Sequence, residues 1–148
     1  MESTLATSHD AELVLKLYDL RREATMRQAR HFMAVEFNPT SFEEFAAVMT
    51  GWGTEKNAWF RQVTSYWEMA VAFVLHGALN GDLFLDCNGE PLFLYAKFQP
   101  FLAEARKLNP GLFRHTERLL EEYPMARERV EAMSKSLAAR AAAAKANA

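Results

Sequence analysis

The chain has 148 residues, the length of a single domain that buries one hydrophobic core. Half of the residues are hydrophobic and 11 are phenylalanine, which excludes intrinsic disorder for the main body. The formal net charge of −2 gives no electrostatic reason to expect binding to nucleic acid or to an anionic membrane.

Residues 1–7 are expected to be disordered, and residues 8–137 to form one helical domain. The first ten residues have neither the basic nor the apolar region of a signal peptide. The single cysteine, Cys87, cannot form an internal disulfide, which fits a reducing compartment. We therefore expect a cytoplasmic protein.

A long first helix is predicted to run from Ser8 or Asp10 to about Phe37, because Asn38-Pro39 stops it. Arg21 and Gln28 fall inside its wide apolar arc, and polar groups placed there need partners or an opening to water.

A short second helix is predicted next. Ser41 and Glu44 have the spacing of a capping box, so this helix begins at Phe42 and runs to about Met49. Gly51-Trp52-Gly53 then ends it, and Thr54 can cap the following helix.

The central helix is predicted over residues 55–79 and organises the core. Its longest uncharged run, Met69 to Gly81, is shorter than the roughly 18 to 20 apolar residues of a membrane span. At about 100° per residue, one broad apolar face forms and a more polar side lies opposite. The apolar face comprises Phe60, Val63, Trp67, Ala70, Val71 and Val74, and the opposite side Arg61, Ser65, Glu68, Ala72 and His76.

Residues 82–98 allow two structures. Asn88-Gly89 between apolar runs favours a small β-hairpin. Asp82 as an N-cap and Pro91 in a first helical turn favour helix instead. We prefer a short helical turn followed by a helix from about Pro91 to Leu108, with the hairpin as the alternative.

Two more helices are predicted, over about Leu112–Glu122 and from Pro124 onwards. The alanine-rich residues 138–148 bury almost nothing and are expected to fray. The last helix has a narrow apolar stripe, which either docks on its own domain or contacts a second copy. This stripe is formed by Ala126, Val130, Met133 and Leu137.

The pattern as a whole predicts an all-α, single-domain bundle of five or six helices. Several short blocks also resemble those of a family of short bacterial helical proteins of unknown function, over about Leu13 to Tyr123. The resemblance implies a bacterial, mainly helical protein and no particular activity. The blocks are Leu20-Arg21-Arg22-Glu23, Tyr66-Trp67-Glu68-Met69-Ala70, His76-Gly77-Ala78-Leu79, Asn88-Gly89-Glu90 and Pro100-Phe101-Leu102.

No catalytic motif is present in the sequence. Paired Glu-x-x-His motifs of di-iron bundles and His-Glu-x-x-His are absent, so we expect neither a metal site nor another cofactor. Gly-x-Ser-x-Gly and phosphate-binding glycine loops are absent as well. The expectation is therefore a non-enzymatic cytosolic protein-interaction or regulatory module that self-associates, with a protein or a second copy as its partner.

Two alternatives remain. The first is a ligand-binding or enzymatic pocket around Arg21, Glu68 and His76, although aromatic residues at helical spacing are more often core. Because both are charges on largely buried helices, Arg21 and Glu68 are also predicted to form an ion pair, with Arg22 as the substitute partner of Glu68. Its polar candidates are Arg21, Gln28, Ser65, Glu68 and His76, and its aromatic candidates are Trp52, Trp59, Tyr66 and Trp67. The second is a helix-turn-helix DNA binder that uses Lys56, Asn57, Arg61 and Gln62.

Overall fold

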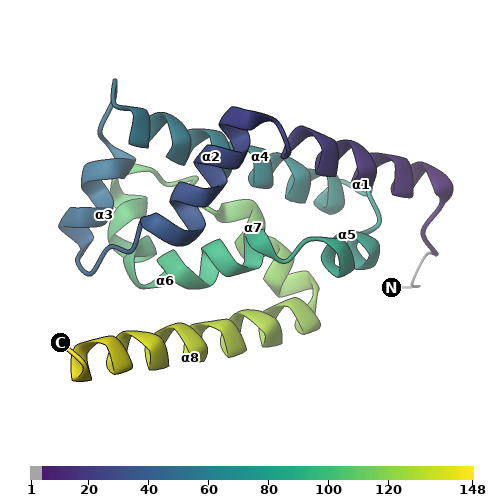
Figure 1. Ribbon diagram of the computed structural model, residues 1–148. Coiled ribbons are helices and arrows are strands. Elements are labelled where there is room, and N and C mark those ends of the chain that lie inside the picture. Colours follow the sequence, from purple (N-terminus) through teal and green to yellow (C-terminus); the bar gives the residue numbers. More distant parts are fainter. Residues whose placement is uncertain (1–4) are drawn as a thin grey trace.

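The computed structural model describes residues 5–148 and is helical throughout, without a strand in that range (Figure 1). The all-α prediction is confirmed, but the described chain has eight α-helices and one π-helical segment rather than five or six helices. They are α1 (Ser8–Leu20), α2 (Ala24–His31), the π-helix η1 (Phe32–Glu36), α3 (Phe42–Met49), α4 (Glu55–Leu75), α5 (Gly81–Cys87), α6 (Glu90–Leu108), α7 (Arg114–Glu122) and α8 (Pro124–Ala146).

The predicted first helix is broken. α1 ends at Leu20, and Glu23 starts α2 by accepting hydrogen bonds from the backbone N–H groups of Thr25 and Met26, at 3.0 and 2.9 Å. The prediction of one helix to Phe37 is therefore wrong. The break changes which residues face the core, and it explains why polar residues fall inside the arc of a continuous helix.

The end of α2 widens into η1, where the N–H of Phe37 donates to the carbonyl of Phe32 over 2.8 Å. Lys97 of α6 donates to the carbonyl oxygens of Met33 and Ala34, at 2.9 and 3.3 Å. These bonds satisfy carbonyls that the helix end leaves open. Burial lowers the pKa of Lys97 to about 8.

The predicted caps of the next two helices are confirmed. The Ser41 hydroxyl accepts from the N–H of Glu44 over 3.2 Å, and the Thr54 hydroxyl accepts from the N–H of Asn57 over 3.2 Å. The Glu44 carboxylate reaches the N–H of Thr40 rather than that of Ser41, at 2.8 Å. Both helices therefore start where the sequence predicts.

The predicted apolar face of α4 is also confirmed. All six residues of its predicted apolar face are buried, and they pack toward α2, α3, η1 and α5. α4 ends at Leu75 rather than residue 79, because Gly77 adopts a φ of +75° that favours glycine and ends the helix. None of the helices described for residues 5–148 has the length and hydrophobicity that crossing a bilayer requires.

Residues 82–87 and 90–98 are helical and only Asn88 and Gly89 separate them, so the hairpin alternative is wrong and the preferred helices are confirmed. Asn88 is buried, and its side-chain amide donates to the carbonyl of Phe84 over 3.1 Å. It therefore completes the end of α5 instead of forming a tight turn between strands.

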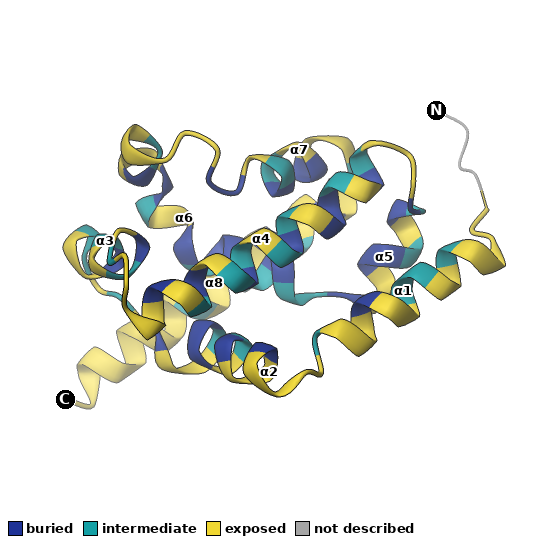
Figure 2. Ribbon diagram, turned by 90° about the horizontal axis from the view of Figure 1, so that it is seen from above, coloured by how far each residue is buried: buried dark blue, intermediate teal, exposed yellow. Residues whose placement is uncertain are grey.

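The stripe on α8 docks on its own domain. Ala126 and Val130 are buried, and Met133 and Leu137 pack partly buried against the core. Residues 138–146 are helical and exposed throughout (Figure 2), so the expected lack of buried surface is confirmed. Of the disordered start that we expect over residues 1–7, residues 1–4 lie outside the described part; residues 5–7 are exposed and form no helix.

Gly81, the first residue of α5, packs closely against the chain that leads into α8. A Cβ atom at this position would overlap the phenol ring of Tyr123, which is partly buried. We expect Gly81→Ala to lower the free energy of unfolding by about 2 kcal/mol, the typical cost of overpacking. Urea denaturation of this variant and of Gly111→Ala, where the nearest atom lies 3.9 Å from the added Cβ, separates the clash from the loss of a glycine.

Candidate functional site

The side of α4 that faces away from the core is open to solvent. We call this the α4 face; it is formed by Arg61, Ser65, Met69, Ala72, Phe73 and His76. Next to it, a depression of about 670 Å³ separates α4 from the connection before α7. Arg61, Ser65 and Glu68 line it from α4, and Asn109, Gly111 and Phe113 from the connection.

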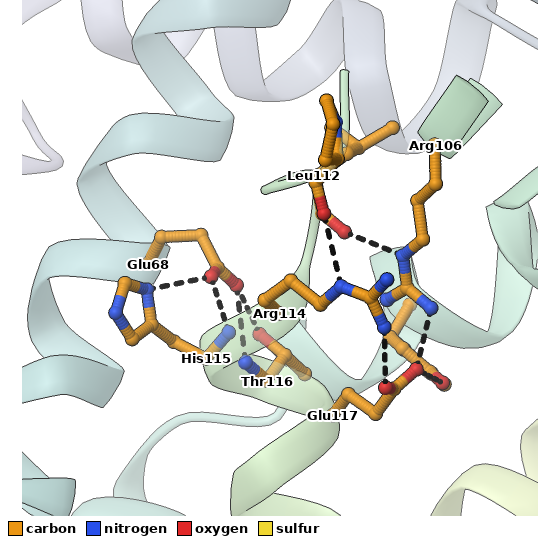
Figure 3. Close-up of polar contacts among 9 residues, drawn as sticks. Glu68, Arg106, Leu112, Arg114, His115, Thr116 and Glu117 are labelled. Atoms are coloured by element: carbon orange, nitrogen blue, oxygen red, sulfur yellow. Dashed lines mark hydrogen bonds and ion pairs between the residues drawn. The ribbon is translucent and has the colours of Figure 1, made fainter. Parts of the chain in front are cut away.

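Glu68 occupies the inner edge of this depression, and its carboxylate starts α7 (Figure 3). It accepts hydrogen bonds from the backbone N–H groups of His115 and Thr116, at 2.8 and 3.2 Å. The Thr116 hydroxyl donates to the same carboxylate over 2.6 Å, and this threonine is buried. A carboxylate at a helix N-terminus is also favoured by the helix dipole.

The same carboxylate orients the imidazole of His115. Its Nδ1 lies 3.0 Å from Glu68 Oε2, and 46% of the His115 side chain is exposed. When Nδ1 carries the proton, Nε2 is left as an acceptor. The pair therefore holds an exposed imidazole in one orientation, through a carboxylate that lines the depression.

The residue before α7 has an unusual backbone. Phe113 is buried and has a φ of 57°, which is costly for a residue with a bulky side chain. Its side chain cannot accept a hydrogen bond from the helix, so Glu68 from α4 supplies the missing cap. This explains why a charged residue is tolerated on the central helix.

A second polar group follows along α7. Glu117 accepts from Arg106 Nη1 at 2.6 Å, from Arg114 Nη1 at 3.0 Å and from the Tyr95 hydroxyl at 3.4 Å. Burial acts to raise the pKa of Glu117, but the bonds and charge of Arg106 and Arg114 outweigh it and lower the pKa. Burial, reinforced by Glu117, raises the pKa of Tyr95.

A third group lies between α2, α4 and α6. Glu90, at the start of α6, accepts from Arg30 Nε at 2.7 Å and from the indole N–H of Trp67 at 2.9 Å. Both charged side chains are largely buried. This group joins α2, α4 and α6, and it presents no obvious reactive atom.

The structure does not bring the predicted polar candidates into one cluster. Ser65 and Glu68 share the depression, whereas Gln28 lines a separate surface hollow on α2 and His76 is exposed at the end of α4. Arg21 lies over the ring of Tyr18. The predicted ion pair between Arg21 and Glu68 is wrong, because the Glu68 carboxylate binds α7 instead.

The aromatic candidates are also divided. Trp67 is buried, Trp59 is partly buried against Phe32, and burial raises the pKa of Tyr66 to about 12. The Tyr66 hydroxyl donates to the carbonyl of Leu17. Only Trp52 is open, with 74% exposed, and Arg61 of the α4 face stacks over its ring at 4.5 Å.

Sequence reasoning missed His115, Thr116 and Glu90 as partners. The helix that contains His115 and Thr116 begins after Phe113, which cannot cap it. This missing cap was the signal in the sequence that another residue must bond to the first backbone N–H groups of the helix. Glu90 was an isolated charge between two apolar runs, and an isolated charge of this kind indicates a buried partner.

Two other classes of site receive no support from the geometry. Within residues 5–148, no three His, Cys, Asp or Glu side chains converge in a way that could hold a metal ion. The helix-turn-helix alternative loses Asn57, which is buried and donates to the carbonyl oxygens of Val48 and Met49, both at 2.9 Å. Arg61 donates to Asn57 as well, over 2.9 Å.

Comparison with known proteins gives a family but no activity. The searches of curated proteins and of solved structures found no match for this chain. A family model described as a domain of unknown function (DUF4760) matches residues 6–123, that is, from just before α1 to the end of α7. This agrees with the resemblance noted in the sequence, and the chain belongs to the DUF4760 family.

Proposed function

We propose that the domain is a non-enzymatic protein-interaction module that self-associates through the α4 face. The observation that carries this proposal is the pair Met69 and Phe73, one turn apart on the central helix, with 41% and 36% of their surface exposed. Large apolar residues on a helix that packs against several others are expected to point inward. Their exposure on its outer side favours a surface that another protein covers.

The polar groups around this pair support the same conclusion. Between Arg61 and His76, the only acidic residue of α4 is Glu68, and its carboxylate is already bonded to α7. Methionine, aromatic residues and arginine are enriched at interfaces, whereas free carboxylates and lysines are depleted. The exposed Trp52, stacked on Arg61, extends the surface at one end.

A second copy is the partner that we favour. A two-fold contact between α4 helices would place the small Ala72 near the point of closest approach, with Met69 and Phe73 of one copy against those of the other. The stripe on α8 was the other surface considered for a dimer. It packs against its own domain, which favours the α4 face as the contact between copies.

We expect Phe73→Asp to weaken self-association by about a hundredfold, because two like charges meet across the two-fold axis. Sedimentation velocity over a wide concentration range measures this. Met125→Asp is the matched control, since Met125 is 48% exposed on α8, away from the α4 face. A wild-type protein that stays monomeric, or a control that dissociates equally, would contradict the proposal.

A second candidate function is the binding of a small molecule in the depression beside Glu68. Its volume of about 670 Å³ and the oriented His115 imidazole favour this candidate. A monomeric wild type whose ligand-dependent stabilisation is lost in His115→Ala would favour it over self-association.

We also propose that the protein works in the bacterial cytoplasm, with its helices arranged as a bundle around α4. The family resemblance supports a bacterial source. An exposed Cys87 without a second cysteine fits a reducing compartment.

A further inference from the structure

A second concave surface lies between α6, α7 and α8. Figure 1 shows α8 beside α6 and on the other side of the molecule from α4, so this surface is separate from the α4 face. The groove has a volume of about 630 Å³, within the range of small-molecule sites. We call it the α8 groove; Tyr95, Glu117, Leu120, Val130, Glu131 and Ser134 line it, among others.

The groove has an apolar base with one hydroxyl that lacks a partner. Leu120 and Val130 are buried and form its apolar part. Ser134 Oγ is buried and makes no hydrogen bond, and among the described residues it shares this property only with Arg106 Nη2. A buried hydroxyl without a partner costs free energy, so a bound group that hydrogen-bonds to Ser134 would remove that cost.

Tyr95 and Glu117 add further oxygen atoms. Arg106 and Arg114 lower the pKa of Glu117 in spite of its burial, so this carboxylate stays ionised. Burial raises the pKa of Tyr95, so its hydroxyl stays protonated and donates to Glu117. The inner groove therefore offers acceptor oxygens on Ser134, Tyr95 and Glu117.

The outer groove adds charge. Glu121 of α7 and Glu131 of α8 line it from two helices, and neither forms an ion pair within residues 5–148. Arg127 and Lys135 line it too, one turn before and one turn after Glu131 along α8, and both are exposed. The outer groove thus carries two carboxylates and two cations, and Glu131 lies one turn or less from Ser134 on the same helix.

We propose that the α8 groove binds a small organic cation, an ammonium group carried on an apolar alkyl or aryl body. The ammonium N–H groups donate to Ser134 Oγ and to the carboxylate of Glu131, and the apolar body packs on Leu120 and Val130. An ammonium group offers three donors and no acceptor, which complements the unpartnered Ser134 oxygen and the Glu131 carboxylate.

Two probes of similar size and opposite charge test this inference: phenethylamine and hydrocinnamate. Each is titrated into the full chain, and proton–nitrogen correlation spectra report the amides that shift. We expect phenethylamine, a cation at neutral pH, to shift amides of α6, α7 and α8 and to bind at least about tenfold more tightly than hydrocinnamate. Equal or tighter binding of the anion, or no binding of the amine, would overturn the proposal.

Two variants locate the site. Ser134→Ala and Glu131→Gln should each weaken the binding of phenethylamine by about tenfold, since each removes a hydrogen bond to a charged group. Glu128→Gln makes the same charge change on an exposed part of α8 outside the groove lining and should leave binding unchanged. If Glu128→Gln weakens binding as much as Glu131→Gln, the amine responds to net charge and the site is wrong.

Discussion

Replacing Glu90 with alanine is expected to lower the free energy of unfolding by about 3 kcal/mol, the scale of a broken buried ion pair. The change leaves the Arg30 guanidinium and the Trp67 indole N–H without their shared acceptor in a largely buried position. For a domain of this size, the melting temperature should fall by about 10 °C. Thermal and urea denaturation measure both values.

Two comparisons identify the cause. Glu104→Ala removes an exposed carboxylate from the same helix and should change stability by less than about 0.5 kcal/mol. The double variant Arg30→Met with Glu90→Leu replaces the ion pair by apolar groups and should recover part of the loss. A Glu90→Ala variant as stable as Glu104→Ala would mean that the group does not join α2, α4 and α6.

Local signals in the sequence predicted the helix starts well. The hydroxyls of Ser41 and Thr54 act within three residues, so their role can be inferred without the tertiary structure. The apolar face of α4 was predictable for a similar reason, because helical periodicity alone assigns Phe60, Val63 and Trp67 to one side.

The breaks within helices were less predictable. Glu23 caps α2 with a residue type that is uncommon at that position, so an otherwise helical pattern concealed the end of α1. The π-helix at Phe32–Glu36 is stabilised by Lys97, which lies more than sixty residues away. Contacts of this kind depend on how the helices pack.

Partners of buried charges were the least predictable feature. Burial of Glu68 required a partner, and the sequence offered Arg21 and Arg22 as well as backbone N–H groups at several helix starts. Phe113 decides the outcome, because it leaves the start of α7 without a cap of its own. Which distant partner a buried charge contacts therefore depends on which helix start in the fold lacks a cap of its own.

Replacing Glu68 with alanine is expected to lower the free energy of unfolding by about 3 kcal/mol. The change removes the cap of α7, which is worth about 1 kcal/mol, and leaves the buried Thr116 hydroxyl without a partner, at about 1 to 3 kcal/mol. Glu68→Gln keeps one acceptor oxygen and should lose less. Urea denaturation gives the order of the two variants.

Hydrogen exchange distinguishes a local cap from a general loss of stability. In Glu68→Ala, the exchange of the His115 and Thr116 amides should accelerate relative to the wild type by more than that of amides in the middle of α6. The reason is that the missing carboxylate is the acceptor of these two amides. Ser65→Ala, one turn earlier on α4 and exposed, should leave both amides unchanged. Equal exchange at α7 in the wild type and Glu68→Ala would show that another group caps the helix.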